Sequence, residues 1–224
     1  MRKPCSVAIA VLQCAVLSGL VVIVSNPETS LAQTSIPTSD RVTSYALTEI
    51  KFPGAIRTGT IALNDRGDIV GDYFDSSLIR HGFLLKQGTF TTIDLPNSTF
   101  TEATAINNAG VVSGYFSDSN NVVHGYLLYR GVFTIYDFPG ATATFAGAVN
   151  DELQVVGIYL DGSSNEHGYL LNHGTFTSID YPGDVAGTEA IGINNRGEIV
   201  GDFIGQGISA LWMFQRRSTR NVPD

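Results

Sequence analysis

One spacing constrains the fold of this chain more than any other feature: marker residues recur every 43 positions. Four prolines keep this interval, and sets of glycines and histidines follow it too. The prolines are Pro53, Pro96, Pro139 and Pro182; the glycines are Gly71, Gly114, Gly157 and, one position late, Gly201; the histidines are His81, His124 and His167. A fixed period of about 40–50 residues is typical of propellers and other repeat arrays. We therefore predict structural roles in a repeat for these marker residues.

Each repeat contains four short β-forming runs. The unit that begins at Thr89 holds FTTIDL, EATAIN, VVSGYF and HGYLLY, separated by turns rich in Pro, Asn and Gly. Such runs are typical of strands, and no stretch after residue 32 shows a sustained helical period. Two hairpins per unit predict a four-stranded antiparallel meander. One turn, Asn150–Leu153, lacks the glycine of its equivalents, so we expect it to be strained or differently shaped.

The two ends of the repeat region predict how the array closes. Residues 46–54 (ALTEIKFPG) align with the last strand of a unit, whereas the final run SALWMFQRR aligns with the strand before it. Joining both ends removes exposed sheet edges. We predict an all-β, four-bladed β-propeller over 46–215. It has four four-stranded antiparallel blades of about 43 residues, the last closed by the N-terminal strand. Part of a larger ring, such as two chains forming eight blades, is the alternative.

The segments outside the repeats read as export and flexible sequences. A basic start, an apolar run over 7–24 and small residues up to Ala32 predict a cleaved signal peptide over 1–32. A retained membrane anchor is the alternative. Residues 33–45 read as a flexible leader and 216–224 as a C-terminal tail. We predict a secreted or periplasmic protein without stable membrane insertion after cleavage.

The chain is acidic, with a formal net charge of −8. Without the first 32 residues it has 11 basic and 20 acidic residues, a net charge of −9. An acidic protein repels phosphate backbones, so nucleic acid is excluded as the expected partner. Both cysteines lie in the signal segment, so the mature chain holds no disulfide. We predict a monomer.

The repeat is similar to the HAF family of extracellular repeats, named for a His-Ala-Phe tripeptide. The matching residues are His81-Gly-Phe83, His124-Gly-Tyr126 and His167-Gly-Tyr169, within a pattern IN..G.IVG…HGF.L..G.FT.ID.PG over nearly all of 46–214. Gly replaces the middle Ala, and the fourth unit reads Ser209-Ala-Leu211, without the histidine. The resemblance implies an exported bacterial protein with propeller-like repeats. The family brings no established activity and therefore no catalytic residue.

The periodic histidines are not expected to bind a metal. Equivalent positions on different blades diverge around a ring, whereas zinc needs all its ligands at about 2 Å. We expect each histidine to hydrogen-bond to a neighbouring blade, with Asp94, Asp137 or Asp180 as acceptors.

Candidate ligand-binding residues lie on the loop face and at the mouth of the central channel. The Pro turns and the polar loops should share one face, which carries Asp118 and Asp161. A ring of four threonines is expected at the axis: Thr58, Thr101, Thr144 and Thr188. The next positions include Glu102 and Glu189 on opposite blades. If both point inward, they form a carboxylate pair for a cation or for acid–base work on a sugar.

No cofactor is predicted. The stretch 161–166 (DGSSNE) is weakly similar to a calcium loop, but Gly at its second position breaks the usual ligand spacing. A divalent cation such as calcium is therefore the one alternative that the sequence leaves open.

The favoured function is a binding or interaction module for a glycan, a surface component or another protein. The sequence lacks a nucleophile elbow, a phosphate-binding loop and a His-Glu-x-x-His motif, so no catalytic residue is predicted. One alternative is a hydrolase or lyase that acts on extracellular polysaccharide through loop-face carboxylates. Another is a structural spacer with no ligand.

Overall fold

The computed structural model describes residues 47–183, 187–205 and 208–214. All its strands belong to the compact unit that spans 48–224. The predicted signal peptide (1–32), leader (33–45) and tail (216–224) lie outside the described residues. Among the residues described, no helix is long and apolar enough to span a membrane.

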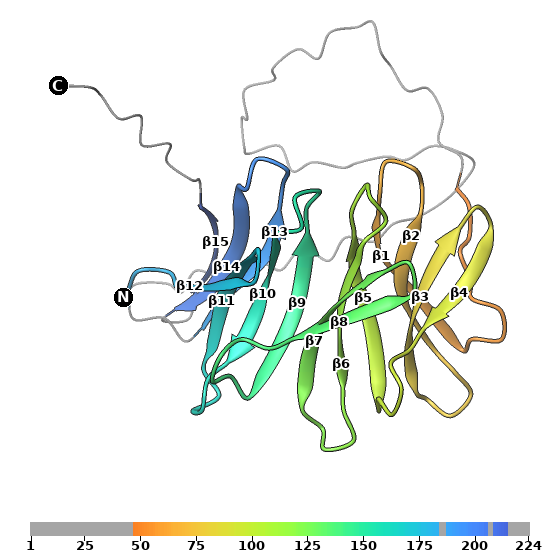
Figure 1. Ribbon diagram of the computed structural model, residues 1–224, viewed down its shortest axis with the longest axis horizontal. Coiled ribbons are helices and arrows are strands. Elements are labelled where there is room, and N and C mark those ends of the chain that lie inside the picture. Colours follow the sequence, from red (N-terminus) through yellow and green to blue (C-terminus); the bar gives the residue numbers. More distant parts are fainter. Residues whose placement is uncertain (1–46, 184–186, 206–207, 215–224) are drawn as a thin grey trace, which may run out of the picture. The chain divides into compact units, whose positions relative to one another are not determined.

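The described residues form fifteen strands and no helix, which confirms the all-β prediction. In chain order they are β1 (Arg57–Leu63), β2 (Ile69–Phe74), β3 (Arg80–Lys86), β4 (Thr89–Ile93), β5 (Phe100–Ile106), β6 (Val112–Ser117), β7 (Val123–Tyr129), β8 (Val132–Tyr136), β9 (Ala143–Val149), β10 (Val155–Leu160), β11 (Glu166–Asn172), β12 (Thr175–Ile179), β13 (Gly187–Ile193), β14 (Ile199–Gly205) and β15 (Ile208–Phe214). Figure 1 shows them as successive hairpins along the chain.

The strands pair in chain order as antiparallel meanders. One four-stranded sheet holds β1–β4 and another holds β5–β8. The third sheet has seven strands: a meander β9–β12 and a meander β13–β15, joined by a single parallel bridge between Glu166 and Gly187. We call these four meanders repeats 1 to 4.

The structure has fifteen strands rather than the expected sixteen. Residues 47–52 carry no strand, and β15 pairs only with β14 among the described strands. The residue before the proline makes the contact that its equivalents make: the ring of Phe52 stacks on Tyr73 with centroids 3.7 Å apart, and Phe138 stacks on Tyr159 at 3.6 Å. No strand among the described residues therefore pairs with the outer edge of β15.

The periodic glycines are explained by a close approach of backbone. A Cβ at Gly71 would lie 2.0 Å from the carbonyl oxygen of Gly59, and a Cβ at Gly157 would lie 2.0 Å from that of Phe145. The approach accompanies an irregularity in the pairing of the first two strands of each repeat. Because any side chain would collide with this carbonyl, the position requires glycine.

The Asn150–Leu153 turn keeps the shape of its equivalents. Leu153 N–H donates to the Asn150 carbonyl at 3.2 Å, as Gly67 N–H donates to Asn64 at 2.9 Å. Leu153 does so with φ 61°, in the region where Gly67 has φ 76°. A leucine in this region is strained, so the missing glycine changes the energy of the turn and not its shape.

Apolar side chains and buried amides join each repeat to the next. At the first junction Val70 and Ile93 of repeat 1 pack with Ile106 and Val112 of repeat 2. A ladder of side-chain amides follows the same order: Asn64 donates to the Asn107 carbonyl (3.1 Å), Asn107 to Asn150 (3.0 Å) and Asn150 to Asn194 (3.1 Å). In the described part of the chain, no such bond returns from Asn194 to repeat 1.

Candidate functional site

The four periodic threonines hold the Pro turns in place. Thr101, Thr144 and Thr188 are fully buried and Thr58 is half-buried. Their hydroxyls accept hydrogen bonds from the backbone N–H groups just before each proline; the donors are Phe52 (3.0 Å), Leu95 (3.5 Å), Phe138 (3.0 Å) and Tyr181 (3.0 Å). All four hydroxyls are engaged, and three of the four side chains are fully buried, so the candidate site does not include them.

The two glutamates at the next positions lie in unlike surroundings. Glu102 forms an ion pair with Arg80 of repeat 1. Among the described residues, no cation lies within ion-pair distance of Glu189; instead burial, and then repulsion from Asp202 and Glu166, raise its pKa. Because one carboxylate is neutralised by an arginine and the other is not, the two do not form a matched pair.

Asp118 and Asp161 organise their own loops. Asp161 Oδ1 accepts from the backbone N–H groups of Ser163 and Asn165, both at 2.8 Å, and Asp118 does the same for Asn120 and Val122. Hydrogen bonds from Asn165 lower the pKa of Asp161 to about 2. Within the described ranges, no group of three or more His, Cys, Asp or Glu residues could hold a metal ion.

Each periodic histidine is clamped between two aspartates of its own repeat. His81 Nδ1 donates to Asp94 at 2.9 Å, while its Nε2 lies 3.5 Å from Asp75 and its ring stacks on Tyr73. The same arrangement recurs at His124 and His167. The expected acceptors are therefore present, but the expectation of a bond to a neighbouring blade is wrong, because the third and fourth strands that carry the pair are adjacent in one sheet.

The strand register corrects the alignment of the fourth repeat. His81 lies opposite Tyr73, and the residue opposite the equivalent Phe203 is Ala210. The fourth repeat thus has Ala210-Leu-Trp212 in place of the histidine motif, one position later than Ser209-Ala-Leu211.

A groove of about 490 Å³ lies between repeats 1 and 2. Repeat 1 lines it with residues of the β1–β2 turn, β3, β4 and Asp94; repeat 2 lines it with the β5–β6 and β7–β8 turns and residues of β6, β7 and β8. None of the ligand-binding residues predicted from the sequence lines it. The lining residues used below are Arg66, Leu84, Lys86, Thr91, Thr92, Ile93, Asp94, Tyr129, Arg130 and Phe133.

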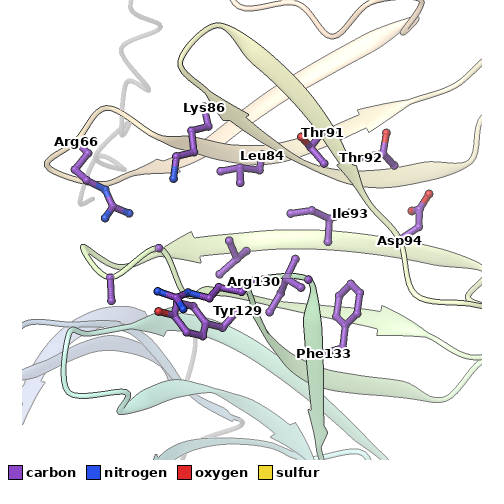
Figure 2. A pocket seen from close by; sticks show the side chains of 15 residues that line it. Arg66, Leu84, Lys86, Thr91, Thr92, Ile93, Asp94, Tyr129, Arg130 and Phe133 are labelled. Carbon is purple, nitrogen blue, oxygen red and sulfur yellow. The ribbon is translucent and has the colours of Figure 1, made fainter.

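The groove changes character along its length (Figure 2). Arg66 and Lys86 reach in at one end, across from Tyr129 and Arg130. Leu84 and Ile93 form the apolar middle, and Thr92 and Asp94 lie at the other end. Burial raises the pKa of Asp94, against the hydrogen bond from His81, which lowers it.

One side chain explains why the groove is open here. The position of Ile93 is taken by Tyr136 at the next junction, where the ring packs so closely on Gly125 that a Cβ there would lie 2.5 Å from it. Ile93 is shorter and leaves this volume empty. The basic residues are also particular to the first junction, since Arg66, Lys86 and Arg130 correspond to Ala109, Tyr129 and His173 one repeat later. Ile179 is the equivalent residue at the third junction, so the basic residues, and not Ile93, are the sequence signal that could have located the groove.

Arg130 stands in a tight hairpin turn. Its φ is 50° and that of Gly131 is 80°, as expected for the type I′ turn that joins two paired strands. Asn, Asp and Gly are the residues favoured at this position. An arginine is therefore not required by the turn, and its side chain is exposed at the groove.

A second cavity of about 260 Å³ lies where the Asn turns of all four repeats meet. It is lined by equivalent triplets: Leu63–Asp65, Ile106–Asn108, Val149–Asp151 and Ile193–Asn195. The third members alternate between carboxylate and amide, and Asn108 donates to both Asp65 (2.7 Å) and Asp151 (3.2 Å). The polar groups of this ring largely satisfy one another.

Comparison with known proteins finds similar solved structures but no family. No family model and no curated protein matches the chain. A structure of AofleA from Arthrobotrys oligospora has a TM-score of 0.47 at 13% identity, and that of its triple arginine-to-alanine mutant has 0.46 at 14%. Both alignments cover 71% of this chain and 53% of that chain, so this chain spans about half the length of these proteins.

Proposed function

We propose that this protein is a binding module that takes a saccharide in the groove between repeats 1 and 2. The observation that carries the proposal is the difference between two equivalent junctions. Tyr136 fills the second, whereas Ile93 leaves the first open by about 490 Å³. The open first junction offers a concave, partly apolar space of the size typical of ligand sites.

The chemistry of the groove suits a sugar better than a wholly apolar ligand. A pyranose ring has apolar C–H faces and a rim of hydroxyl groups. The floor offers the half-buried Leu84 and Phe133 to the faces, while Thr91 and Tyr129 offer hydroxyls to the rim. Both hydroxyl-bearing side chains are exposed and can therefore exchange water for a ligand.

The test is to fill the groove with the tyrosine that occupies the equivalent position at the second junction. Ile93→Tyr copies Tyr136, and Gly82 beneath Ile93 corresponds to the Gly125 on which Tyr136 packs. In a glycan-panel binding assay, the wild-type chain should bind at least one saccharide and Ile93→Tyr should lose it. Ile179→Tyr makes the same change at the third junction and should leave binding intact. Equal binding by wild type and Ile93→Tyr would place the ligand elsewhere.

We also propose that the four repeats are blades of a four-bladed propeller closed by the N-terminal strand. Two observations support closure. The second cavity is lined by all four repeats. Moreover, Val200 of repeat 4 is 44% exposed where the equivalent Val70 and Val156 are 0% exposed, and Leu63 is 69% exposed where Ile106 is 7%. These are the two sides of one unformed junction.

The remaining proposals rest on the sequence. We propose that the chain is exported to the periplasm or beyond by residues 1–32, is a monomer and is a repeat protein of the HAF type. The 43-residue period and the His-Gly-aromatic motifs support the last of these.

A further inference from the structure

We infer that the saccharide taken by the groove is acidic, and that its carboxylate is held by Arg66, Lys86 and Arg130. The inference rests on the proposed function, since it names the ligand class of the same groove. It concerns only the basic end, where these three side chains converge from two repeats (Figure 2).

The basic end is an exception in an acidic protein. The chain carries a net charge of −8, and residues 47–214 contain only seven Lys and Arg. Three of the seven line this one groove, together with a single carboxylate, Asp94, at its other end. Such local concentration of positive charge attracts an anion in spite of the net charge.

Of the three cations, Arg130 is the one without a carboxylate partner among the described residues. None of the described carboxylates lies within ion-pair distance of it, and its guanidinium lies over the ring of Tyr129, 5.0 Å from the centroid. This stacking leaves the planar edge of the guanidinium free for a two-pronged bond to a carboxylate. The equivalent turns hold Gln87 and His173 in the same conformation, so the arginine is particular to the turn at this groove.

Arg66 and Lys86 are positioned by one shared, buried carboxylate. Asp68 Oδ2 lies 3.1 Å from Arg66 and 3.9 Å from Lys86, and the Asp68 side chain is 6% exposed. Asp68 cancels one of the three charges and leaves the basic end with a net charge of about +2. The Arg66 guanidinium lies over Gly110, where a Cβ would come within 2.8 Å of it, so the glycine makes room for this placement.

A uronic acid has both features that the groove can bind: an apolar ring face and a carboxylate. Its ring faces fit the apolar floor, and its carboxylate projects from the ring edge toward one end. Ionised partners make hydrogen bonds worth roughly twice as much as neutral ones. A neutral sugar would leave the basic end to water, so the acidic sugar should bind more tightly.

The experiment compares tetragalacturonic acid with its methyl ester by isothermal titration calorimetry on the full chain. The acid should bind at least about tenfold more tightly than the ester. Raising NaCl from about 50 to about 300 mM should weaken the acid more than the ester. Arg130→Asn should cost the acid about tenfold and the ester little. Asn suits the turn, so this variant should fold at least as well as the wild type.

The controls separate this inference from the proposed function. His173→Asn makes the equivalent change in repeat 3 and should leave acid binding unchanged. Equal affinity for acid and ester, with both lost in Ile93→Tyr, would overturn the carboxylate and keep the saccharide groove. Acid binding that survives Ile93→Tyr would overturn both. If neither probe binds while a neutral glycan does so in an Ile93-dependent manner, only the acidic ligand is overturned.

Discussion

At the scale of single residues, comparing the repeats shows which residues cost the fold stability. Leu153 adopts φ 61° at a position that its equivalents give to glycine. The left-handed conformation costs a side chain about 1–2 kcal/mol, and the extra freedom of glycine in the unfolded chain offsets up to about 1 kcal/mol of the gain. Leu153→Gly should therefore raise the free energy of unfolding by up to about 1 kcal/mol, measured by urea denaturation.

The opposite change supplies the control. Gly67 has the same role in repeat 1, and a Cβ there would meet nothing within 4 Å. Gly67→Leu should lower stability through backbone strain alone. If Leu153→Gly were destabilising, the leucine side chain would be contributing more through packing than its conformation costs.

The buried threonines yield a second prediction at the residue scale. Thr144 is fully buried and accepts from Phe138 N–H at 3.0 Å. Thr144→Val keeps the shape and leaves this donor unsatisfied, at a cost of about 1–3 kcal/mol. Thermal or urea unfolding measures the loss, while saccharide binding should persist in the folded variant. Unchanged stability with lost binding would return the threonine to a ligand role.

At the scale of elements, the histidine clamps tie the third strand of a repeat to its fourth. Although partial burial opposes it, the hydrogen bonds and charges of Asp180 and Asp161 raise the pKa of His167. A raised pKa means that the folded protein binds the proton more tightly than the unfolded chain does. The stabilisation is complete below the unfolded value of about 6.5 and is lost as the pH rises through the folded value.

The corresponding measurement compares wild type with His167→Gln by urea unfolding across about pH 5.5 to 8.5. The stability advantage of wild type should be largest at the acid end and shrink toward the alkaline end. His173→Gln is the matched control, because His173 lies in an exposed turn with no aspartate or glutamate partner among the described residues. An advantage that grows with pH would contradict the clamp.

Elements were the level at which the sequence was most predictive. Strands and turns repeat every 43 residues, so several equivalent segments predict each of them. Glycines such as Gly71 fall where the backbone leaves no room for a side chain. The site was not predictable in this way. The period places Thr101 near the axis, but only the packing shows that its hydroxyl is buried against the Pro turn. The groove depends on a difference between two repeats, Ile93 in the first and Tyr136 in the second, and only the packing at the two junctions shows what this difference does.

At the scale of the whole molecule, the open question is what covers the junction that the described residues leave unformed. Val200 and Leu63 are exposed although their equivalents are buried. Each buried aliphatic side chain contributes about 1.5–3 kcal/mol, so the two faces gain by meeting. They are the two halves of one repeating interface, and each can pair with the other either in the same chain or in a second copy.

A cysteine pair distinguishes these arrangements. Met213 lies opposite Val200 as Leu84 lies opposite Val70, and Leu84 pairs with Thr91, the repeat equivalent of Thr48. If the N-terminal strand completes repeat 4, Thr48→Cys and Met213→Cys should therefore face each other at a distance that a disulfide spans. The test uses the full chain with Cys5 and Cys14 replaced by serine, mild oxidation, and non-reducing electrophoresis with mass spectrometry.

A cross-linked monomer is the expected product, because closure within one chain avoids the entropy that association of two chains costs. It should also unfold at a higher temperature than its reduced form, since the bond closes a loop of more than a hundred residues. A cross-linked dimer would instead show that two chains share the ring. The groove between repeats 1 and 2 would then occur twice per assembly, and a polymeric ligand would bind with avidity. If the cysteines at positions 48 and 213 both stay free, repeat 4 has an open edge and the proposed closure is overturned.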